Sequence, residues 1–426
     1  MLRISAALLA LLLVAPVAAS RTLIHAGAVI DGVSDTASGP STVVVEDGMI
    51  TAVVAGFSAP AEGDQVVDLR RSTLLPGLID LHTHLSSEYD AHAYIEEFQL
   101  NPADYALLAV PRALATLEAG FMTVRDLGDS YNVTVSLRNA IARGQVPGPR
   151  ILTAAKSIAS TGGHADPTNG WADIIEGTPG PAEGVADGVP AAMQAVRQRY
   201  KDGADLIKIT ATGGVLSVAA NGLNPQFTQE EMDAIVRVAS DYGMHVAAHS
   251  HGKEGMLRAI RAGVQTIEHG TMMDAEVMRE MRRSGTILVP TLSAGRWVTQ
   301  MSAIDGFFPE VVRTKAASIG PLMDTTFAAA VRQNVPIAFG TDTGVTPHGE
   351  NGREFAYMVE DGMAPMDAIR SATSVAARVL DLQDRIGQVR AGFVADLVAV
   401  GGDPLADPSL LASVSFVMQA GTVVVP

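Results

Sequence analysis

The chain has 426 residues, of which 47% are hydrophobic and 18% are charged. This length suits a large barrel with an accessory domain, and the composition is that of a globular protein with a sizeable core. The formal net charge is −16 and no basic cluster stands out, which argues against a nucleic-acid partner. Because the chain has no cysteine, it forms no disulfides, and any metal ligand must be His, Asp, Glu or a modified Lys.

The first twenty residues, MLRISAALLALLLVAPVAAS, have the pattern of a secretory signal. Arg3 supplies a positive start, residues 4–14 are apolar, and residues 17–19 are small. An uncleaved membrane anchor is the weaker interpretation, because the apolar core is short for a bilayer. We therefore predict a signal peptide over 1–20, a periplasmic or secreted protein, and no stable membrane span once the signal is removed.

Both ends of the remaining chain are rich in short Val- and Thr-containing runs separated by Gly and Asp. Examples are TLIHAGAVIDG and STVVVEDGMITAVV near the start, and GFVADLVAV and SFVMQAGTVVV near the end. Such runs are typical of strands joined by turns. We expect residues 21–73 and 381–426 to form one small β-sandwich domain together.

Between these ends, residues 74–380 alternate between apolar strand-like runs and helical patterns. This alternation indicates an α/β fold with a parallel sheet, and eight runs predict a TIM-like (β/α)8 barrel. In such barrels the catalytic residues follow the carboxyl ends of the strands. The eight runs lie at 74–84, 122–129, 150–160, 204–210, 244–252, 264–270, 286–293 and 335–344.

Polar residues of metal-binding type lie at the ends of several runs. In GLIDLHTHL, His82 and His84 are two apart and therefore share one face of a strand, as a ligand pair or as two structural histidines. His249 ends the fifth run, His269 the sixth and Asp342 the eighth. Their expected convergence on one rim of the barrel favours a metal site over a structural role.

Lys208 lies inside the apolar run ADLIKIT. A buried lysine is costly unless it is paired or neutral. One interpretation is an ion pair with Asp126 or Asp205. The interpretation that we favour is that burial lowers its pKa and that the neutral amine captures CO2 as a carbamate, a carboxylate able to bridge two cations.

The set of HxH after the first strand, Lys after the fourth, His after the fifth and sixth, and Asp after the eighth resembles the binuclear amidohydrolase superfamily. The phrases LLPGLIDLHTHL, ASTGGHAD, TIEHG and GTDTG are similar to its imidazolonepropionase-related branch, which contains Xaa-Pro and related metallo-carboxypeptidases and ochratoxin-degrading amidohydrolases. The resemblance covers almost the whole chain after the signal. It is specific for the metal ligands and less so for the substrate.

The resemblance implies a role for each ligand. His82, His84 and Asp342 would hold one divalent cation, His249 and His269 a second, and carbamylated Lys208 would bridge the two. Such ligands suit Zn²⁺, and two cations generate a nucleophile from water at neutral pH. Asp342 would act as general base and then general acid.

Two further histidines are candidates for contact with the substrate. His164, in ASTGGHAD, is assigned by the resemblance to stabilising the carbonyl or oxyanion and to substrate binding, with loop capping as the alternative. His251 shares a face with His249 and either contacts the substrate or is structural. Residues 215–226 and 295–310 are the expected pocket walls, the second containing Trp297, Met301, Phe307 and Phe308.

The leading functional hypothesis is a zinc-dependent amide hydrolase. It would release a C-terminal apolar or aromatic amino acid from dipeptides or N-acyl amino acids, with ochratoxin A as a possible accidental substrate. Alternatives are hydrolysis of a cyclic amide, as in imidazolonepropionase, or of a lactone. A non-catalytic barrel is disfavoured because no ligand position is lost. The resemblance also implies a homo-oligomer acting on a small-molecule substrate.

Overall fold

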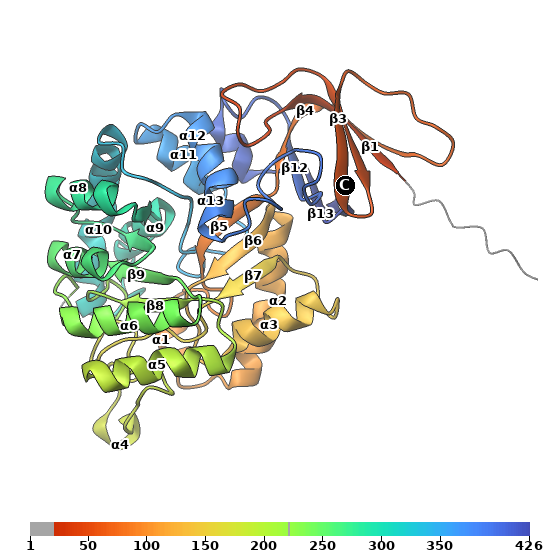
Figure 1. The fold of residues 1–426 in the computed structure, drawn as a ribbon. Helices are drawn as coiled ribbons and strands as arrows, with labels where there is room; N and C mark the ends of the chain where they lie inside the picture. The colour runs from red at the N-terminus through yellow and green to blue at the C-terminus, as the bar shows by residue number, and fades with distance from the viewer. Residues whose placement is uncertain (1–20, 220–221) are drawn as a thin grey trace, which may run out of the picture.

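The computed structural model describes residues 21–219 and 222–426, so the predicted signal peptide lies outside the described residues. Two parts are visible in Figure 1: a β-sheet that gathers both ends of the chain, and a larger part built of parallel strands and helices. No helix in the described part of the chain is long and apolar enough to cross a membrane.

Seven strands from the two ends of the chain form one sheet, in the order β14-β13-β12-β4-β1-β2-β3. Strands β1 and β4 are parallel, and the other pairs are antiparallel. The expectation that both ends build one β unit is therefore confirmed. The strands are β1 (Thr22–Val29), β2 (Ser41–Glu46), β3 (Met49–Ala55), β4 (Gln65–Pro76), β12 (Leu397–Val400), β13 (Phe416–Gln419) and β14 (Thr422–Val425).

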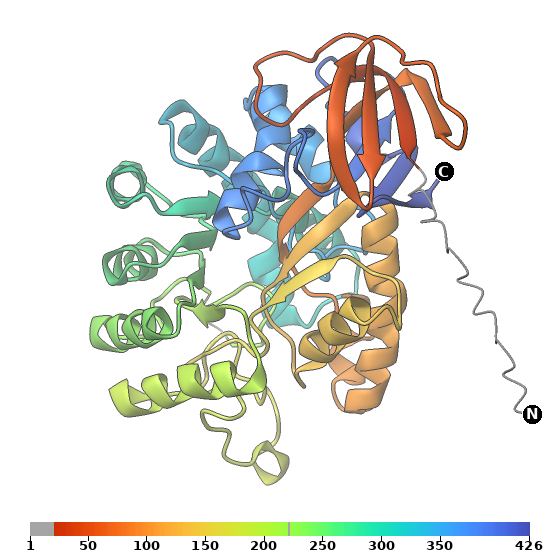
Figure 2. The same ribbon diagram turned by 45° about the vertical axis from the view of Figure 1, so that its right-hand side comes forward.

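The seven strands are continuous, so they are not two separate sheets as a β-sandwich would have. Instead, the sheet folds around its own core, which joins residues from both halves, such as Val43 and Ile50 with Leu397 and Met418. The turn at Gly48 lies against the backbone of Ala420. Strand β4 belongs to the N-terminal half yet pairs with β12, and this pairing makes the sheet continuous. Figure 2 shows the sheet apart from the helices.

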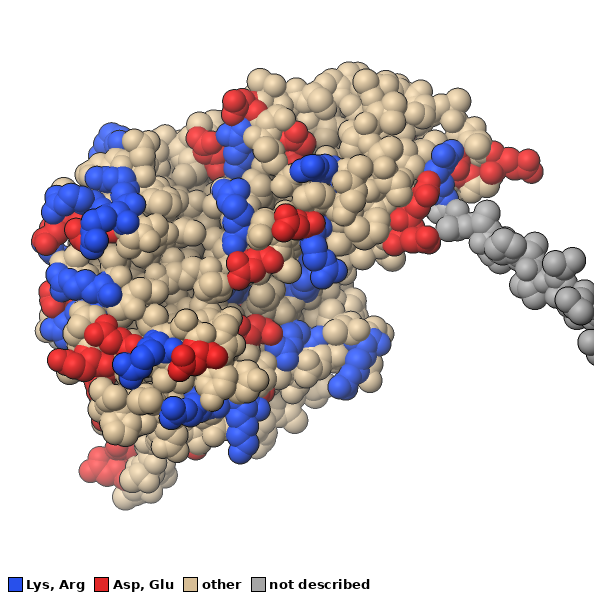
Figure 3. All heavy atoms as spheres, viewed as in Figure 1, with Lys and Arg blue, Asp and Glu red and all other residues tan. Residues whose placement is uncertain are grey.

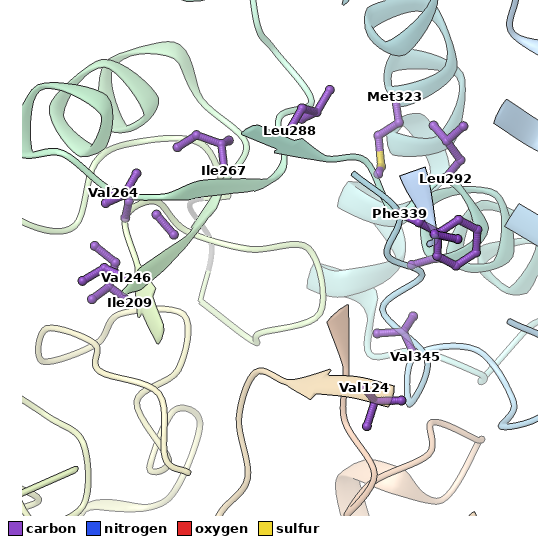
Figure 4. Packing of buried hydrophobic residues seen from close by; sticks show 14 of the residues in the cluster. Val124, Ile209, Val246, Val264, Ile267, Leu288, Leu292, Met323, Phe339 and Val345 are labelled. Carbon is purple, nitrogen blue, oxygen red and sulfur yellow. The ribbon is translucent and has the colours of Figure 1, made fainter. Parts of the chain in front are cut away.

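Seven parallel strands form the centre of the larger part, in two sheets ordered β5-β6-β7 and β11-β10-β9-β8. Their side chains are buried, and residues such as Val124, Ile209, Val246 and Leu288 belong to one hydrophobic cluster with residues of the surrounding helices (Figure 4). The strands are β5 (Leu78–Thr83), β6 (Phe121–Asp126), β7 (Arg150–Thr153), β8 (Ile207–Thr210), β9 (Val246–Ser250), β10 (Thr266–His269) and β11 (Ile287–Val289).

The parallel α/β arrangement is confirmed, but a closed eight-stranded barrel is not formed among the described residues. Isolated bridges, together with a few backbone hydrogen bonds, join the gaps: Ile158 with Ile209, Leu288 with Ile337, and Thr83 with Thr343. The eighth run, 335–344, is irregular for a physical reason. Asp342 has a φ of 61°, which an extended strand excludes. Gly340 lies so close to β5 that a Cβ there would be 3.1 Å from the backbone nitrogen of His82.

Helices follow the parallel strands and cover their outer side. Figure 1 shows α5, α6, α7 and α8 stacked in chain order, which places each next to its sequence neighbour. The helices are α1 (Ala93–Glu96), α2 (Pro102–Glu118), α3 (Val133–Ala142), α4 (Asp173–Glu176), α5 (Gly188–Asp202), α6 (Gln229–Asp241), α7 (Lys253–Ala262), α8 (Ala275–Ser284), α9 (Leu292–Ser302), α10 (Glu310–Arg332), α11 (Arg353–Glu360), α12 (Pro365–Ser371), α13 (Ser374–Val379) and the 3₁₀-helix η1 (Pro408–Ala412).

Helix ends follow local sequence rules. Helix α6 begins with a capping box in which Thr228 and Glu231 bond each other's backbone, and α8 begins at Asp274, whose carboxylate accepts two backbone N–H groups. On the face shown in Figure 3, acidic and basic side chains are interspersed. Lys253, for example, pairs with Asp274 and Glu276.

Candidate metal centre

All six ligands predicted from the sequence line one cavity of about 840 Å³. His82 lies in β5 and His84 directly after it, Lys208 in β8, His249 in β9 and His269 at the end of β10. Asp342 lies in the irregular segment next to β5. The strands bring these side chains together because parallel strands end on the same side of a sheet. The six are His82, His84, Lys208, His249, His269 and Asp342.

Three of these residues form a compact group with metal-ligand chemistry. One ligand atom from each of His82, His84 and Asp342 lies within 4.8 Å of the others. Oδ1 of Asp342 is 3.3 Å from Nε2 of His82 and 3.2 Å from Nε2 of His84. Burial alone would raise the pKa of Asp342, but the two imidazoles and Lys208 outweigh burial and lower it to about 2. The carboxylate is therefore ionised, as a ligand must be.

Lys208 is only 4% exposed, and its Nζ lies 3.4 Å from Nε2 of His82. Within residues 21–219 and 222–426 it forms neither of the two ion pairs that the sequence left open. Asp205 pairs with Arg138 at 2.5 Å, and Asp126 accepts a hydrogen bond from the backbone N–H of Leu85. Burial lowers the pKa of Lys208 to about 8, against the opposing charges of Glu268 and Asp342. A neutral amine is therefore accessible near neutral pH.

The imidazoles of His249 and His269 face each other with ring centroids 4.6 Å apart. Each is oriented by one hydrogen bond directed away from the other ring. Nε2 of His249 donates to the carbonyl of Gly213 at 3.1 Å, and Nδ1 of His269 bonds Oγ1 of Thr291 at 2.8 Å. Burial, followed by neighbouring imidazoles, holds the pKa of both well below the ordinary value, so both present a lone pair.

Three residues with a strained backbone lie at this site. His269, Thr291 and Asp342 all have positive φ, at 70°, 53° and 61°, although none is glycine. Each such residue costs roughly 1–3 kcal/mol and persists only where the surrounding structure imposes it. The strain coincides with two ligand candidates and with the hydrogen-bond partner of one of them.

His164 stacks on His249 with ring centroids 4.3 Å apart, and burial holds its pKa near 3. Its Nδ1 is buried without a hydrogen-bond partner among the described residues. Gly214 abuts the ring so closely that any Cβ there would overlap it. The neutral imidazole therefore lies between Gly214 and His249 at the wall of the cavity, a position compatible with contact to a substrate.

His251 also lines the cavity, next to His249 at a ring distance of 4.7 Å. Its Nδ1 bonds Oγ1 of Thr271 at 2.7 Å, and burial lowers its pKa to about 4. Both roles considered for His251 therefore remain compatible with its position, since it borders the cavity and is also tied to the structure.

The cavity has two unlike walls. The aliphatic wall contains residues from the loop after β8, from α9 and α10, and from the segment after Asp342: Val215, Leu216, Ala294, Val298, Ile319, Met323 and Val345. The other group of lining residues is aromatic and polar, with Tyr89, Glu97, Tyr105, Tyr131 and Trp171. The loop of Val215 and Leu216 is fixed by Lys315, which donates to three of its carbonyls, and by Tyr94, which donates to the carbonyl of Leu216.

The prediction that residues 295–310 form a wall of the pocket is only partly correct. Gly295 and Val298 line the cavity, whereas Trp297, Met301, Phe307 and Phe308 are absent from its described lining. Trp297 instead contacts Phe307 and Phe308 at ring distances of 5.5 and 6.3 Å. Helical geometry explains this, because neighbouring residues of α9 point in different directions and only one face meets the cavity.

Sequence reasoning missed two buried charges under the site, Arg125 and Glu268. Arg125 Nη2 donates to Glu268 at 2.9 Å, and the other carboxylate oxygen of Glu268 lies 2.9 Å from Nδ1 of His82. The sequence contained a signal for both residues, because Arg125 and Glu268, like Lys208, are charged residues inside apolar strands. The tyrosines of the polar wall gave no comparable signal, because tyrosine is common in cores and at surfaces alike.

Comparison with known proteins agrees with this geometry. A solved structure of a Xaa-Pro dipeptidase with bound methionine has a TM-score of 0.93 and 52% identity, and the match covers 96% of this chain and all of that one. Ochratoxinase from Aspergillus niger is 31% identical over 91% of this chain and 82% of its own. A prolidase complexed with N-methylphosphonate-L-proline has a TM-score of 0.86 and 30% identity, over 95% and 99% of the two chains. The pattern of the amidohydrolase family matches residues 73–425. The chain belongs to the amidohydrolase family.

Proposed function

We propose that this protein is a binuclear metal-dependent hydrolase that removes a C-terminal apolar amino acid from dipeptides or N-acyl amino acids. Hydrolysis of an amide bond is the activity that its family and relatives support. The observation that carries the metal centre is the convergence of six ligand-type side chains in one cavity, three of them with ligand atoms within 4.8 Å.

The donor set fits two divalent cations. His82, His84 and Asp342 would hold one cation, His249 and His269 the other, and Lys208 would join them as a carbamate. Imidazole and carboxylate ligands suit Zn²⁺, with Mn²⁺ or Co²⁺ as substitutes. When bound, the cations would supply Lewis acidity that polarises the scissile carbonyl and activates water. Carbamate formation joins the neutral amine of Lys208 to CO2 and releases one proton.

The chain's own residues supply the acid–base chemistry. Asp342 is ionised and next to two imidazoles, so its carboxylate is placed to accept the proton of the attacking water and to pass it to the leaving amine. His164 lines the cavity with a neutral imidazole, which can donate an N–H to the carbonyl oxygen as charge develops there. His251, beside His249, would contact the bound substrate.

The aliphatic wall supports the preference for an apolar side chain on the released amino acid. Val298 and Met323 contribute apolar surface there, and the relatives include a dipeptidase with methionine bound and ochratoxinase. Ochratoxin A, an aryl amide of phenylalanine, would then be an accidental substrate. We further propose an exported homo-oligomer with the catalytic domain in residues 74–380. Sequencing of the mature N-terminus tests export, because a chain that begins at Met1 contradicts cleavage.

The substrate proposal is tested with zinc-loaded protein and three compounds at equal concentration: N-acyl-Phe, its C-terminal amide and N-acyl-Lys. We expect N-acyl-Phe to be cut fastest. Equal rates for the acid and the amide would contradict recognition of the free carboxylate, and faster cleavage of the lysine compound would contradict the apolar wall. No cleavage of any compound by protein with two bound cations would contradict the proposed reaction itself.

A further inference from the structure

Two opposite charges are buried directly behind the imidazole of His82. Arg125 is 1% exposed and Glu268 is fully buried. They come from β6 and β10, which belong to different sheets, and they meet under His82 of β5. The pair therefore lies in the interior between the two sheets, beneath the proposed ligands.

Hydrogen bonds from the guanidinium of Arg125 and from the imidazole of His82 converge on the carboxylate of Glu268. Arg125 donates from Nε to the carbonyl of Leu81 at 2.7 Å and from Nη2 to Oε1 of Glu268 at 2.9 Å. Thr266 donates its hydroxyl to the same carboxylate oxygen. Oε2 of Glu268 is 2.9 Å from Nδ1 of His82. Because an ionised carboxylate only accepts, Nδ1 of His82 must carry the proton, and its lone pair is at Nε2.

That lone pair points into the proposed centre. Nε2 of His82 is 3.3 Å from Oδ1 of Asp342 and 3.4 Å from Nζ of Lys208. His82 is thus the imidazole that adjoins both the carboxylate and the lysine of the site. A change in its tautomer would turn an N–H toward the place where a cation needs a lone pair.

The partners of the other candidate ligands are uncharged. Nδ1 of His84 bonds the carbonyl of Gly128 at 2.9 Å, His249 bonds the carbonyl of Gly213, and His269 bonds the hydroxyl of Thr291. Within the part of the chain that the structure describes, His82 alone among these four has a carboxylate behind it. An anionic partner makes the imidazole a stronger donor to a cation than a neutral partner does.

Stability does not explain why these charges are present. Burying an ion pair carries a large desolvation penalty, and apolar residues of similar volume often serve folding equally well. Arg125 also leaves Nη1 without a partner among the described residues, which adds to the cost. A costly buried pair with one end on a candidate ligand is better explained by the properties of that ligand.

We infer that Arg125 and Glu268 are positioning residues that hold His82 in its Nδ1–H form and strengthen Nε2 as a cation ligand. Glu268 fixes the ring directly, and Arg125 acts through Glu268 by anchoring and balancing its carboxylate. This inference rests on the metal centre of the proposed function. It concerns the affinity of the site and the tautomer of one imidazole, so it can be measured without any substrate.

The test compares Glu268→Gln and Arg125→Met with matched controls in the full chain. Glu354→Gln removes another fully buried carboxylate, whose partners are the backbone and side chain of α9 and not a histidine. Arg199→Met removes another fully buried arginine, which bonds Ala182 and pairs with Asp202. Three quantities are measured: the free energy of unfolding, the Zn²⁺ affinity by competition with a chromophoric chelator, and the ¹⁵N spectrum of the imidazoles in metal-free protein.

We expect Glu268→Gln to weaken Zn²⁺ binding by about 10–100-fold, and Arg125→Met to weaken it by a smaller factor. In the spectrum, the His82 signal, assigned by its loss in His82→Asn, should show Nδ1–H in the unaltered chain and a mixture of tautomers in Glu268→Gln. Both controls should keep the parental Zn²⁺ affinity, even where their unfolding free energy falls.

Parental Zn²⁺ affinity in folded Glu268→Gln would overturn the inference and assign the pair to folding alone. An Nε2–H form of His82 in the unaltered chain would overturn it too. If Glu268→Gln does not fold, Arg125→Lys decides. Lysine keeps the positive charge, but its single ammonium group cannot bond both the carbonyl of Leu81 and the carboxylate of Glu268 as the guanidinium does. Weaker Zn²⁺ binding by this variant supports the inference, and parental binding refutes it. A chain that binds Zn²⁺ without cutting amides refutes only the proposed function.

Discussion

Replacing Gly214 by alanine tests the role of His164 without touching His164 itself. A Cβ at this position would overlap the imidazole, whereas ordinary contact begins near 3.4 Å, so the ring must withdraw by about 1 Å. Movement of the loop is opposed by Lys315, which donates to the carbonyl of Gly214 at 2.8 Å. A displacement of this size at a reacting group costs roughly 10²-fold in rate. We expect kcat/KM to fall by about 10²-fold, or ~2.7 kcal/mol of transition-state stabilisation, with both cations retained.

A double-mutant cycle decides whether the loss passes through His164. If it does, Gly214→Ala costs little in a His164→Ala background, because the displaced ring is already gone. Gly401→Ala is the matched control, since a Cβ there meets nothing within 4 Å. Steady-state kinetics on an N-acyl amino acid and metal analysis of each variant provide the readouts. Unchanged activity in Gly214→Ala, or a full additional loss in the His164→Ala background, would refute the reasoning.

Three other changes probe the ligands and the framework. Lys208→Ala should lose at least one cation by elemental analysis and about 10²-fold or more in kcat, with partial rescue by short carboxylic acids; full activity without additives would exclude the carbamate. Asp342→Asn should lower kcat by about 10²–10⁴-fold in a stopped assay, and near-normal turnover would identify another base. Burial raises the pKa of Glu354 to about 7, so folding favours its protonated form and stability falls as pH rises from about 4.5 to 7. Glu354→Gln should reduce the decrease of Tm between about pH 4.5 and pH 7. An unchanged dependence of Tm on pH would contradict the raised pKa of Glu354.

The positions of the candidate ligands could be predicted because they depend on strand order and strand ends. His82 and His84 are separated by one residue on an apolar run, and His249 and His269 end two others, so a parallel arrangement brings them to one rim. The local pattern of each strand end therefore predicts which side chains, distant in the sequence, lie close together in the fold. The same logic applied to Lys208, whose burial follows from its place in an apolar strand.

Features that depend on exact packing could not be predicted in this way. The eighth run reads as a strand, but the approach of Gly340 to β5 and the left-handed backbone of Asp342 make it irregular. The continuity of the terminal sheet depends on β4 pairing with β12, a contact between segments more than 300 residues apart. The direction of Trp297 likewise depends on how α9 is rotated against the cavity, which composition does not specify.

Several features that cost stability meet at the cavity. His269, Thr291 and Asp342 have strained backbones, and the buried pair behind His82 carries a desolvation penalty. Lys208 is buried with no carboxylate of the described residues at bonding distance. A fold selected only for stability would relax each of these features, since apolar and unstrained alternatives exist for all of them. Their coincidence around one cavity means that the surrounding core holds them in place. Substitutions that stabilise the chain at these positions should therefore weaken the site, whereas stabilising substitutions in the terminal sheet should leave the site unchanged.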